Sequence, residues 1–201
     1  MNKAIFIAAA AIAFSVPSAF AQSTTTNTTP NNPPTIADRK ENQQDRIAQG
    51  VQSGELTSGE TKRLETGEAA LNKEEHTMRT EDNGHLTAVD RTKLNNQQNR
   101  LSNRIYDDKH NAATQHYGNS EVGKREENQQ DRIAQGIKSG QLTPAESARL
   151  EKQQQGLNRE VNGMREANGG KLTPYEKALV NHQQNHASAN IHAKKHNGRV
   201  Q

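Results

Sequence analysis

The chain of 201 residues contains no cysteine and no tryptophan, and aromatic residues make up only 3% of it. The lack of cysteine excludes a disulfide framework and a lipidated N-terminus. All three phenylalanines lie within the first 20 residues, which leaves three tyrosines as the aromatic side chains of the remainder. Charges of both signs are mixed along the chain, and the net charge is +3. Because basic faces and stacking aromatics are missing, we expect no nucleic-acid partner.

Long hydrophobic runs are also scarce. The run Ala4–Phe14 follows Lys3 and precedes the small-residue pattern Ala19–Ala21, which is typical of a cleaved secretory signal peptide over residues 1–21. This run is too short to span a bilayer, and no other run qualifies. We therefore expect an exported protein without a membrane span, located in the periplasm or outside the cell.

The segment after the signal peptide, residues 22–38, is rich in serine, threonine, asparagine and proline. Pro30, Pro33 and Pro34 forbid a helix, and the segment has almost nothing to bury. The composition predicts a disordered tether.

A tandem repeat organises the rest of the chain. Residues 39–111 recur without a gap at 125–197, an offset of 86 (125 minus 39), and both copies contain Glu-Asn-Gln-Gln-Asp-Arg-Ile-Ala-Gln-Gly. Large apolar residues are few, yet they fall at equivalent positions, as expected of a buried set. The equivalent pairs are Ile47/Ile133, Val51/Ile137, Leu56/Leu142, Leu64/Leu150, Leu71/Leu157, Met78/Met164, Leu86/Leu172, Leu94/Val180, Leu101/Ala187 and Ile105/Ile191.

A shorter motif, Gly-x-Leu-Thr-x-x-Glu/Asp, occurs twice in each copy, at residues 54–60, 84–90, 140–146 and 170–176. Each threonine is suited to cap a helix, and the acidic residue three positions later completes a capping box. Pro144 and Pro174 would occupy the first helical position, and the glycine suits the left-handed end of the preceding helix. The motif therefore predicts four helix starts.

These signals predict an all-α fold with two tandem three-helix antiparallel hairpins or bundles. Repeat 1 covers residues 39–111, a linker covers 112–123, and repeat 2 covers 124–197. We expect helices at 39–53, 58–81, 88–111, 124–139, 144–167 and 174–197. The middle helices carry a seven-residue, coiled-coil-like apolar step. Each repeat is expected to fold as a separable unit of marginal stability, so that association into a homo-oligomer or with a partner would help.

The Gly-x-Leu-Thr-x-x-Glu motif also resembles the second half of an EF-hand calcium loop. In the loop 79–90, Glu81, Asn83 and Asp90 take ligand positions 3, 5 and 12, but Arg79 occupies the first position. Few carboxylates remain to bind a hard cation. The pattern favours helix capping over a calcium site.

Histidines form a second candidate metal site. His182, His186, His192 and His196 make two i,i+4 pairs on the last expected helix, on the face opposite its apolar residues. Exposed pairs of this kind bind Zn²⁺, Ni²⁺ or Cu²⁺ weakly. Repeat 1 has other residues at three of the four positions, so a solvated polar face is the competing interpretation, and no tightly bound cofactor is expected.

The chain resembles a group of uncharacterised bacterial exported proteins, through the stretches at 46–60, 63–65, 84–87 and 99–111 and their counterparts in repeat 2. Leu-Thr-x-x-Glu is also similar to the Leu-Thr-x-x-Gln motif of the Spy/CpxP periplasmic chaperones. The resemblance implies an envelope or secreted location and no established activity. A nucleophile elbow, a phosphate loop and His-Glu-x-x-His are missing, so we expect no enzyme.

Two hypotheses follow from the sequence. The first is a non-enzymatic exported helical interaction or structural protein of the cell envelope, with a role in stress and with an unknown protein or envelope component as partner. The alternative is a low-affinity divalent-metal binding protein that uses the histidines or the EF-hand-like loops.

Overall fold

A computed structural model describes residues 33–199. All six helices belong to one compact unit that begins at Pro34, and this described part contains no strand, which confirms the all-α class. The predicted signal peptide and most of the tether lie outside the described residues. The helices are α1 (Ile36–Ser53), α2 (Ser58–Glu81), α3 (Ala88–Lys109), α4 (Glu121–Lys138), α5 (Pro144–Ala167) and α6 (Pro174–Lys195).

Four of the helices start where the repeated motif predicts. At the start of α2, the Thr57 hydroxyl accepts from the backbone N–H of Glu60 at 3.3 Å, and the Glu60 carboxylate accepts from the N–H of Thr57 at 2.9 Å. The same reciprocal box caps α3, α5 and α6 through Thr87, Thr143 and Thr173. Two donors that would otherwise be orphaned are thereby satisfied at each start.

The first helix of each repeat begins three residues earlier than expected. Thr35 and Asp38 form a further capping box ahead of α1, and Ser120 caps α4. The tether predicted over 22–38 and the linker predicted over 112–123 are therefore each too long at their C-terminal ends. The Thr35–Asp38 spacing is itself a capping signal, but it stands in a segment whose prolines favour an extended chain.

A close approach explains a glycine within each copy of the ten-residue string. The N–H of Leu56 donates to the Gly50 carbonyl at 2.9 Å, and the N–H of Leu142 donates to the Gly136 carbonyl at 3.0 Å. A Cβ atom at Gly50 or Gly136 would lie 2.6 Å from the leucine side chain. The missing side chain lets the leucine cover the end of the helix.

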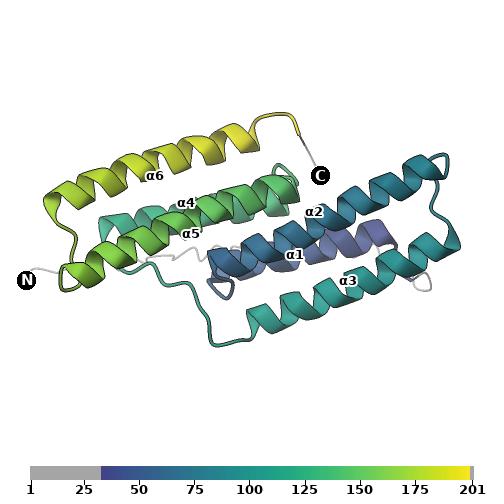
Figure 1. Ribbon diagram of the computed structural model, residues 1–201, viewed down its shortest axis with the longest axis horizontal. Helices are drawn as coiled ribbons and strands as arrows, with labels where there is room; N and C mark the ends of the chain where they lie inside the picture. The colour runs from purple at the N-terminus through teal and green to yellow at the C-terminus, as the bar shows by residue number, and fades with distance from the viewer. Residues whose placement is uncertain (1–32, 200–201) are drawn as a thin grey trace, which may run out of the picture. The chain divides into compact units, whose positions relative to one another are not determined.

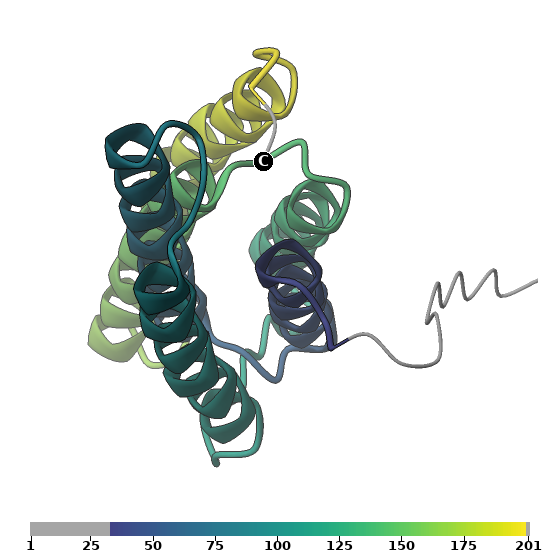
Figure 2. The ribbon, with the colours of Figure 1, turned by 90° about the vertical axis from the view of Figure 1, so that its right-hand side faces the viewer.

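The helices form two layers, as Figure 2 shows in end view: α3, α2, α5 and α6 lie in one, and α1 and α4 cover it. Helix α2 packs against α5, and α1 packs against α4, so that each repeat contacts the other through its first two helices. Helix α3 packs on α1 and α2, and α6 packs on α4 and α5 (Figure 1). The third helices are thus the outer ones.

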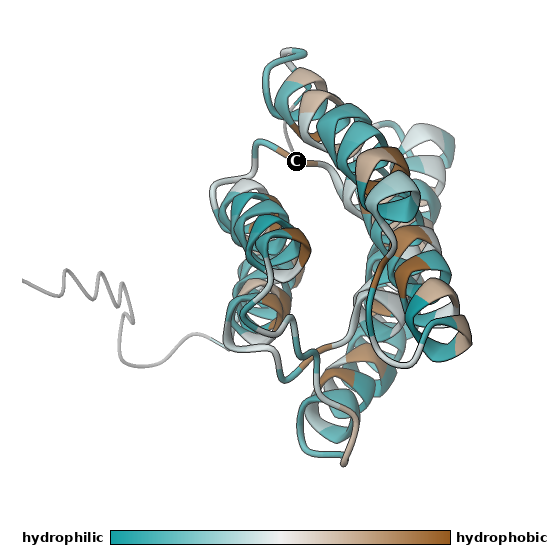
Figure 3. Cartoon of the chain, turned by 90° about the vertical axis from the view of Figure 1, so that its left-hand side faces the viewer, coloured by the Kyte–Doolittle hydropathy of each residue, from teal (hydrophilic) through white to brown (hydrophobic). Residues whose placement is uncertain are grey.

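One hydrophobic cluster runs through both repeats. It joins Ile47 and Leu64 of repeat 1 to Ile133, Leu150 and Ile191 of repeat 2. The predicted core positions are buried, except that Met164 and Leu172 are only partly buried. Figure 3 shows hydrophobic residues as narrow bands on otherwise hydrophilic helices. The repeats are therefore two halves of one six-helix body that share this main core, and a smaller buried cluster of Val122, Leu157, Val161 and Val180 lies within repeat 2.

Candidate functional site

The EF-hand-like loop is used for helix capping. The Asp90 carboxylate accepts from the Thr87 N–H at 3.0 Å and from the Thr87 hydroxyl at 2.5 Å. Glu81 is exposed at the end of α2, and Asn83 sits in the following turn with φ 52°. Within residues 33–199, no group of three or more His, Cys, Asp or Glu side chains is placed to hold a metal ion.

The four candidate histidines are exposed and lie in two separate pairs on α6. The ring centroids of His182 and His186 are 4.8 Å apart, in an edge-on arrangement, and those of His192 and His196 are 4.2 Å apart and stacked. Nδ1 of His196 is 2.7 Å from the His192 carbonyl oxygen. Each pair thus offers at most two ligands.

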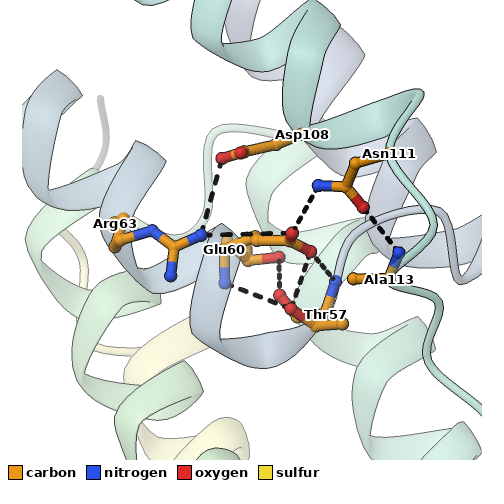
Figure 4. A network of polar contacts seen from close by, with 7 residues as sticks. Thr57, Glu60, Arg63, Asp108, Asn111 and Ala113 are labelled. Atoms are coloured by element: carbon orange, nitrogen blue, oxygen red, sulfur yellow. Dashed lines mark hydrogen bonds and ion pairs between the residues drawn. The ribbon is translucent and has the colours of Figure 1, made fainter.

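The repeated string Lys-His-Asn ends in an asparagine that ties the third helix to the start of the second. Asn111 donates to Glu60 Oε1 at 2.8 Å and accepts from the N–H of Ala113 at 2.7 Å (Figure 4). Repeat 2 keeps the contact, since Asn197 donates to Glu146 at 2.6 Å. Its amide thus holds two helix ends together in each repeat.

The capping glutamates are therefore ionised structural groups. Partial burial opposes the charge on Glu60, but hydrogen bonds from Asn111 and Thr57 hold its pKa below the ordinary value. Arg63 lies between Glu60, at 4.0 Å, and Asp108, at 3.9 Å. In repeat 2 the pKa of Glu146 is lowered in the same way by Asn197 and Thr143. Both oxygens of Glu60 are thus held by groups of the fold, through Thr57 and Asn111.

The centre of the molecule is unexpectedly polar. Gln43 donates to the Gln98 carbonyl at 2.7 Å and to the Ser102 hydroxyl at 2.8 Å, and Gln129 makes the matching bonds in repeat 2. These amides bind the first helix of each repeat to its own third helix. They explain why the Gln-Gln pair is kept in both copies of the ten-residue string.

Two glutamates at equivalent positions, Glu65 of α2 and Glu151 of α5, are fully buried, each with 0% exposure. Gln44 donates to Glu65 Oε2 at 3.4 Å, and Gln130 donates to Glu151 Oε2 at 3.1 Å. Gln130 also donates to the Ser58 hydroxyl at 3.0 Å. The Oε1 atom of each glutamate is buried without a hydrogen-bond partner, which is costly for a charged carboxylate.

Burial raises the pKa values of these two glutamates and of two further ones. It raises the pKa of Glu65 well above its usual range, and the charges of Glu68 and Glu151 raise it further. Burial also raises the pKa of Glu151, Glu68 and Glu126 to about 7 each. The sequence analysis missed these residues, although Glu65 and Glu151 are identical in both copies and directly follow a core leucine.

A different pair of equivalent positions is exposed although it carries large apolar side chains. Val89 at the start of α3 is 77% exposed, and its counterpart Tyr175 at the start of α6 is 79% exposed. Leu179, one turn after Tyr175, is also exposed. Val89 and Tyr175 each lie in the first turn of the third helix of their repeat, directly after the hairpin turn that leads into it. We call these two regions the hairpin tips.

Among residues 33–199, no helix is both long and apolar enough to cross a membrane. Comparison of the chain with protein-family models, with curated proteins and with solved structures finds no match.

Proposed function

We propose that this chain is an exported, non-catalytic interaction protein of the cell envelope, and that it contacts a protein or envelope component through its hairpin tips. The observation that carries this proposal is the pair Val89 and Tyr175. Both repeats expose a large apolar side chain at the same position, where neither side chain contributes to the buried core. Exposed apolar side chains that gather in a patch mark interaction sites, and Tyr175 lies one helical turn from the exposed Leu179.

The arrangement favours binding at two places at once. The turn between α2 and α3 and the turn between α5 and α6 lie at opposite ends of the six-helix unit (Figure 1). Two weak contacts held on one rigid body act together, because the first contact raises the effective concentration for the second. The tandem duplication therefore gives the molecule one candidate contact site at each end.

The interior acids support a non-catalytic role. A general acid or base must come within hydrogen-bond distance of a substrate. Glu65 and Glu151 are the groups with strongly raised pKa values at the centre of the described fold, and neither has any surface exposure. Their raised pKa values therefore affect the stability of the fold, and neither carboxyl is accessible to a substrate.

Site-specific photo-crosslinking in intact bacterial cells tests this proposal. A photoreactive amino acid would replace Val89 or Tyr175 in the full chain, and matched controls would carry it at Asn103 and Ala189, which are exposed equivalent positions of the same helices. We expect discrete crosslinked species from the tip positions and none from the controls, with the chain recovered from the exported fraction. Equal crosslinking at all four positions, or recovery in the cytoplasm, would contradict the proposal.

The histidine pairs favour a second candidate, weak binding of Zn²⁺, Ni²⁺ or Cu²⁺ on α6. The observation that supports it is the closeness of the rings of His182 and His186, whose centroids lie 4.8 Å apart. Because metal ligation needs neutral imidazole, retention of the full chain on immobilised nickel should fade below about pH 6. Replacing these residues with their repeat 1 counterparts, as His182→Asn and His186→Arg, should reduce retention. Unchanged retention would exclude this pair as the site.

A further inference from the structure

The duplication places two identical acids where the two repeats meet. Glu65 and Glu151 are equivalent residues, α2 packs directly against α5, and the charge of Glu151 acts on Glu65. Two like groups are thus fully buried on the two helices through which the repeats pack. In such a position the first proton lost makes the second harder to lose.

The groups that surround the pair offer no compensating positive charge. Helix α1 presents the neutral amide of Gln44, α4 presents that of Gln130, and α2 adds Ser58 and a further acid, Glu68. Lys40 of α1 acts on Glu68, but no basic side chain of the described residues contributes to the pKa of Glu65 or Glu151. On the linker side, burial raises the pKa of Tyr117, and the negative charges of Glu151 and Glu126 raise it further, so this side offers no cation either.

The consequences of the two protonation states are opposite. A protonated carboxyl can be buried at small cost, because it carries no charge and gains a hydroxyl donor. Ionised, the pair would place two negative charges in the interior without a cation, where the Oε1 atom of each already lacks a hydrogen-bond partner, and a buried unpaired charge is strongly destabilising. Ionisation of the pair therefore weakens the interface between the two repeats.

We propose that the Glu65–Glu151 pair is a proton-operated latch between the two repeats. The protonated pair holds α2 against α5, and α1 against α4. Ionisation loosens the contact between the two repeats, which stay joined by the linker and by part of their shared core, while each keeps its three helices. The inference stands whether or not the hairpin tips bind a partner.

The hydrogen bonds explain why the molecule opens at this boundary. Within repeat 1, α1 is bound to α3 by Gln43 and by Gln98, which donates to the Ile36 carbonyl at 2.9 Å. Repeat 2 has the same bonds. Across the boundary, Gln130 donates to Ser58 and Lys62 donates to Gln155 at 3.2 Å. The polar ties thus favour motion of whole repeats over the loss of a single helix.

Distance measurement between spin labels tests the latch. The chain has no cysteine, so labels can be placed on the full chain through Asn103→Cys and Ala189→Cys, on the exposed faces of α3 and α6. At pH 5.5 we expect one narrow distance distribution. At pH 8.5 we expect a broad, longer one, with the helical circular dichroism signal unchanged. The double variant Glu65→Gln and Glu151→Gln should stay narrow at both pH values.

The matched control replaces exposed equivalent acids, Glu41→Gln and Glu127→Gln, and should behave as the wild type does. If the double glutamine variant fails to fold, Glu151→Gln alone keeps the test open, because removal of one charge should move opening to higher pH. A distance that ignores pH overturns the latch, and so does opening that persists in the glutamine variants. Loss of helix together with distance would show general unfolding, and closure by excess Ca²⁺ or Zn²⁺ at pH 8.5 would show a cation site instead.

Discussion

The position of Lys40 forms a salt bridge in repeat 1, whereas the equivalent position in repeat 2 carries the buried acid Glu126. In repeat 1, Lys40 lies 3.1 Å from Glu75, which also binds Arg79 at 2.8 Å. In repeat 2 the equivalent of Lys40 is Glu126, and the equivalent of Glu75 is Val161. Glu126 is buried, and its Oε1 has no hydrogen-bond partner. The backbone tolerates either a salt bridge or an acid beside an apolar residue.

This difference gives the repeats opposite responses to pH. Burial opposes the charge on Glu75, but Arg79 and Lys40 hold its pKa below the ordinary value, so its contribution to stability is lost as the pH falls. Burial raises the pKa of Glu126 from 4.5 to about 7, so its contribution is present at acidic pH and is lost as the pH rises towards 7 and above. Glu126 therefore destabilises the fold as the pH rises, as the Glu65–Glu151 pair also does.

Separation of the repeats is the change with the largest expected effect. Residues 33–111 and 120–199, expressed apart, would each expose the face that the other repeat covers, including Ile47 or Ile133. The repeat pattern alone predicts that each half folds by itself, but the shared core predicts an unfolded monomer. Circular dichroism should show helix only at concentrations that allow two copies to pair. A cooperative melt independent of concentration would contradict the shared core.

Gly50→Ala and Gly136→Ala come next. The added Cβ would lie 2.6 Å from Leu56 or Leu142, and overpacking of this kind costs about 1–3 kcal/mol. The free energy of unfolding, measured with urea, should fall by a similar amount in both repeats. Gly163→Ala is the matched control, because its Cβ meets open space within a helix and should be neutral or stabilising. A loss confined to one repeat would show that the two turns are not equivalent.

Glu126→Gln tests the pH comparison itself. A pKa moved from 4.5 to about 7 in a group that keeps some solvent screening is worth roughly 2 kcal/mol at high pH. The variant should be more stable than the wild type at pH 8.5 and about equal to it at pH 4.5. Glu75→Gln in repeat 1 should destabilise at pH 8.5, because it removes the partner of Lys40 and Arg79. Equal responses of both variants at every pH would refute the difference between the repeats.

The capping threonines give the smallest effects. Each of Thr57→Ala, Thr87→Ala, Thr143→Ala and Thr173→Ala should lower the free energy of unfolding by about 0.5–2 kcal/mol. The losses at Thr57 and Thr143 should be the larger, because their glutamates are buried and also bind an asparagine. Thr66→Ala, in the middle of α2, is the control. If Ca²⁺ raised the melting temperature and Asp90→Ala abolished the rise, the loops would be ion sites after all.

Local signals in the sequence were sufficient for the helices and the apolar core. Thr57 and Glu60 form a capping box because the chemistry involves only neighbouring residues, and Leu64 is buried because it repeats at a core position. The polar centre could not be predicted in this way. Glutamates such as Glu65 are rarely buried without a partner, and its burial depends on how α2 meets α5, which a single-chain pattern of repeats does not specify.

The exposed residues, too, could be predicted only in part from the sequence. The helical periodicity placed His182 and His186 on the outer face of α6, and they lie there. It gave no reason to single out Val89 and Tyr175, because an apolar residue in a first helical turn is ordinary in sequence. Their exposure at equivalent positions of the fold distinguishes them.

Direct titration of the buried glutamates tests the central claim, that the repeats meet at a protonated acid pair. The side-chain carboxyl ¹³C signals of Glu65 and Glu151 would be followed by NMR in the full chain labelled at glutamate, with assignment by the Glu65→Gln and Glu151→Gln variants. We predict a midpoint near pH 7 for Glu151 and a midpoint for Glu65 well above the ordinary glutamate value of 4.5. Midpoints for both residues near the ordinary value of 4.5 would contradict it.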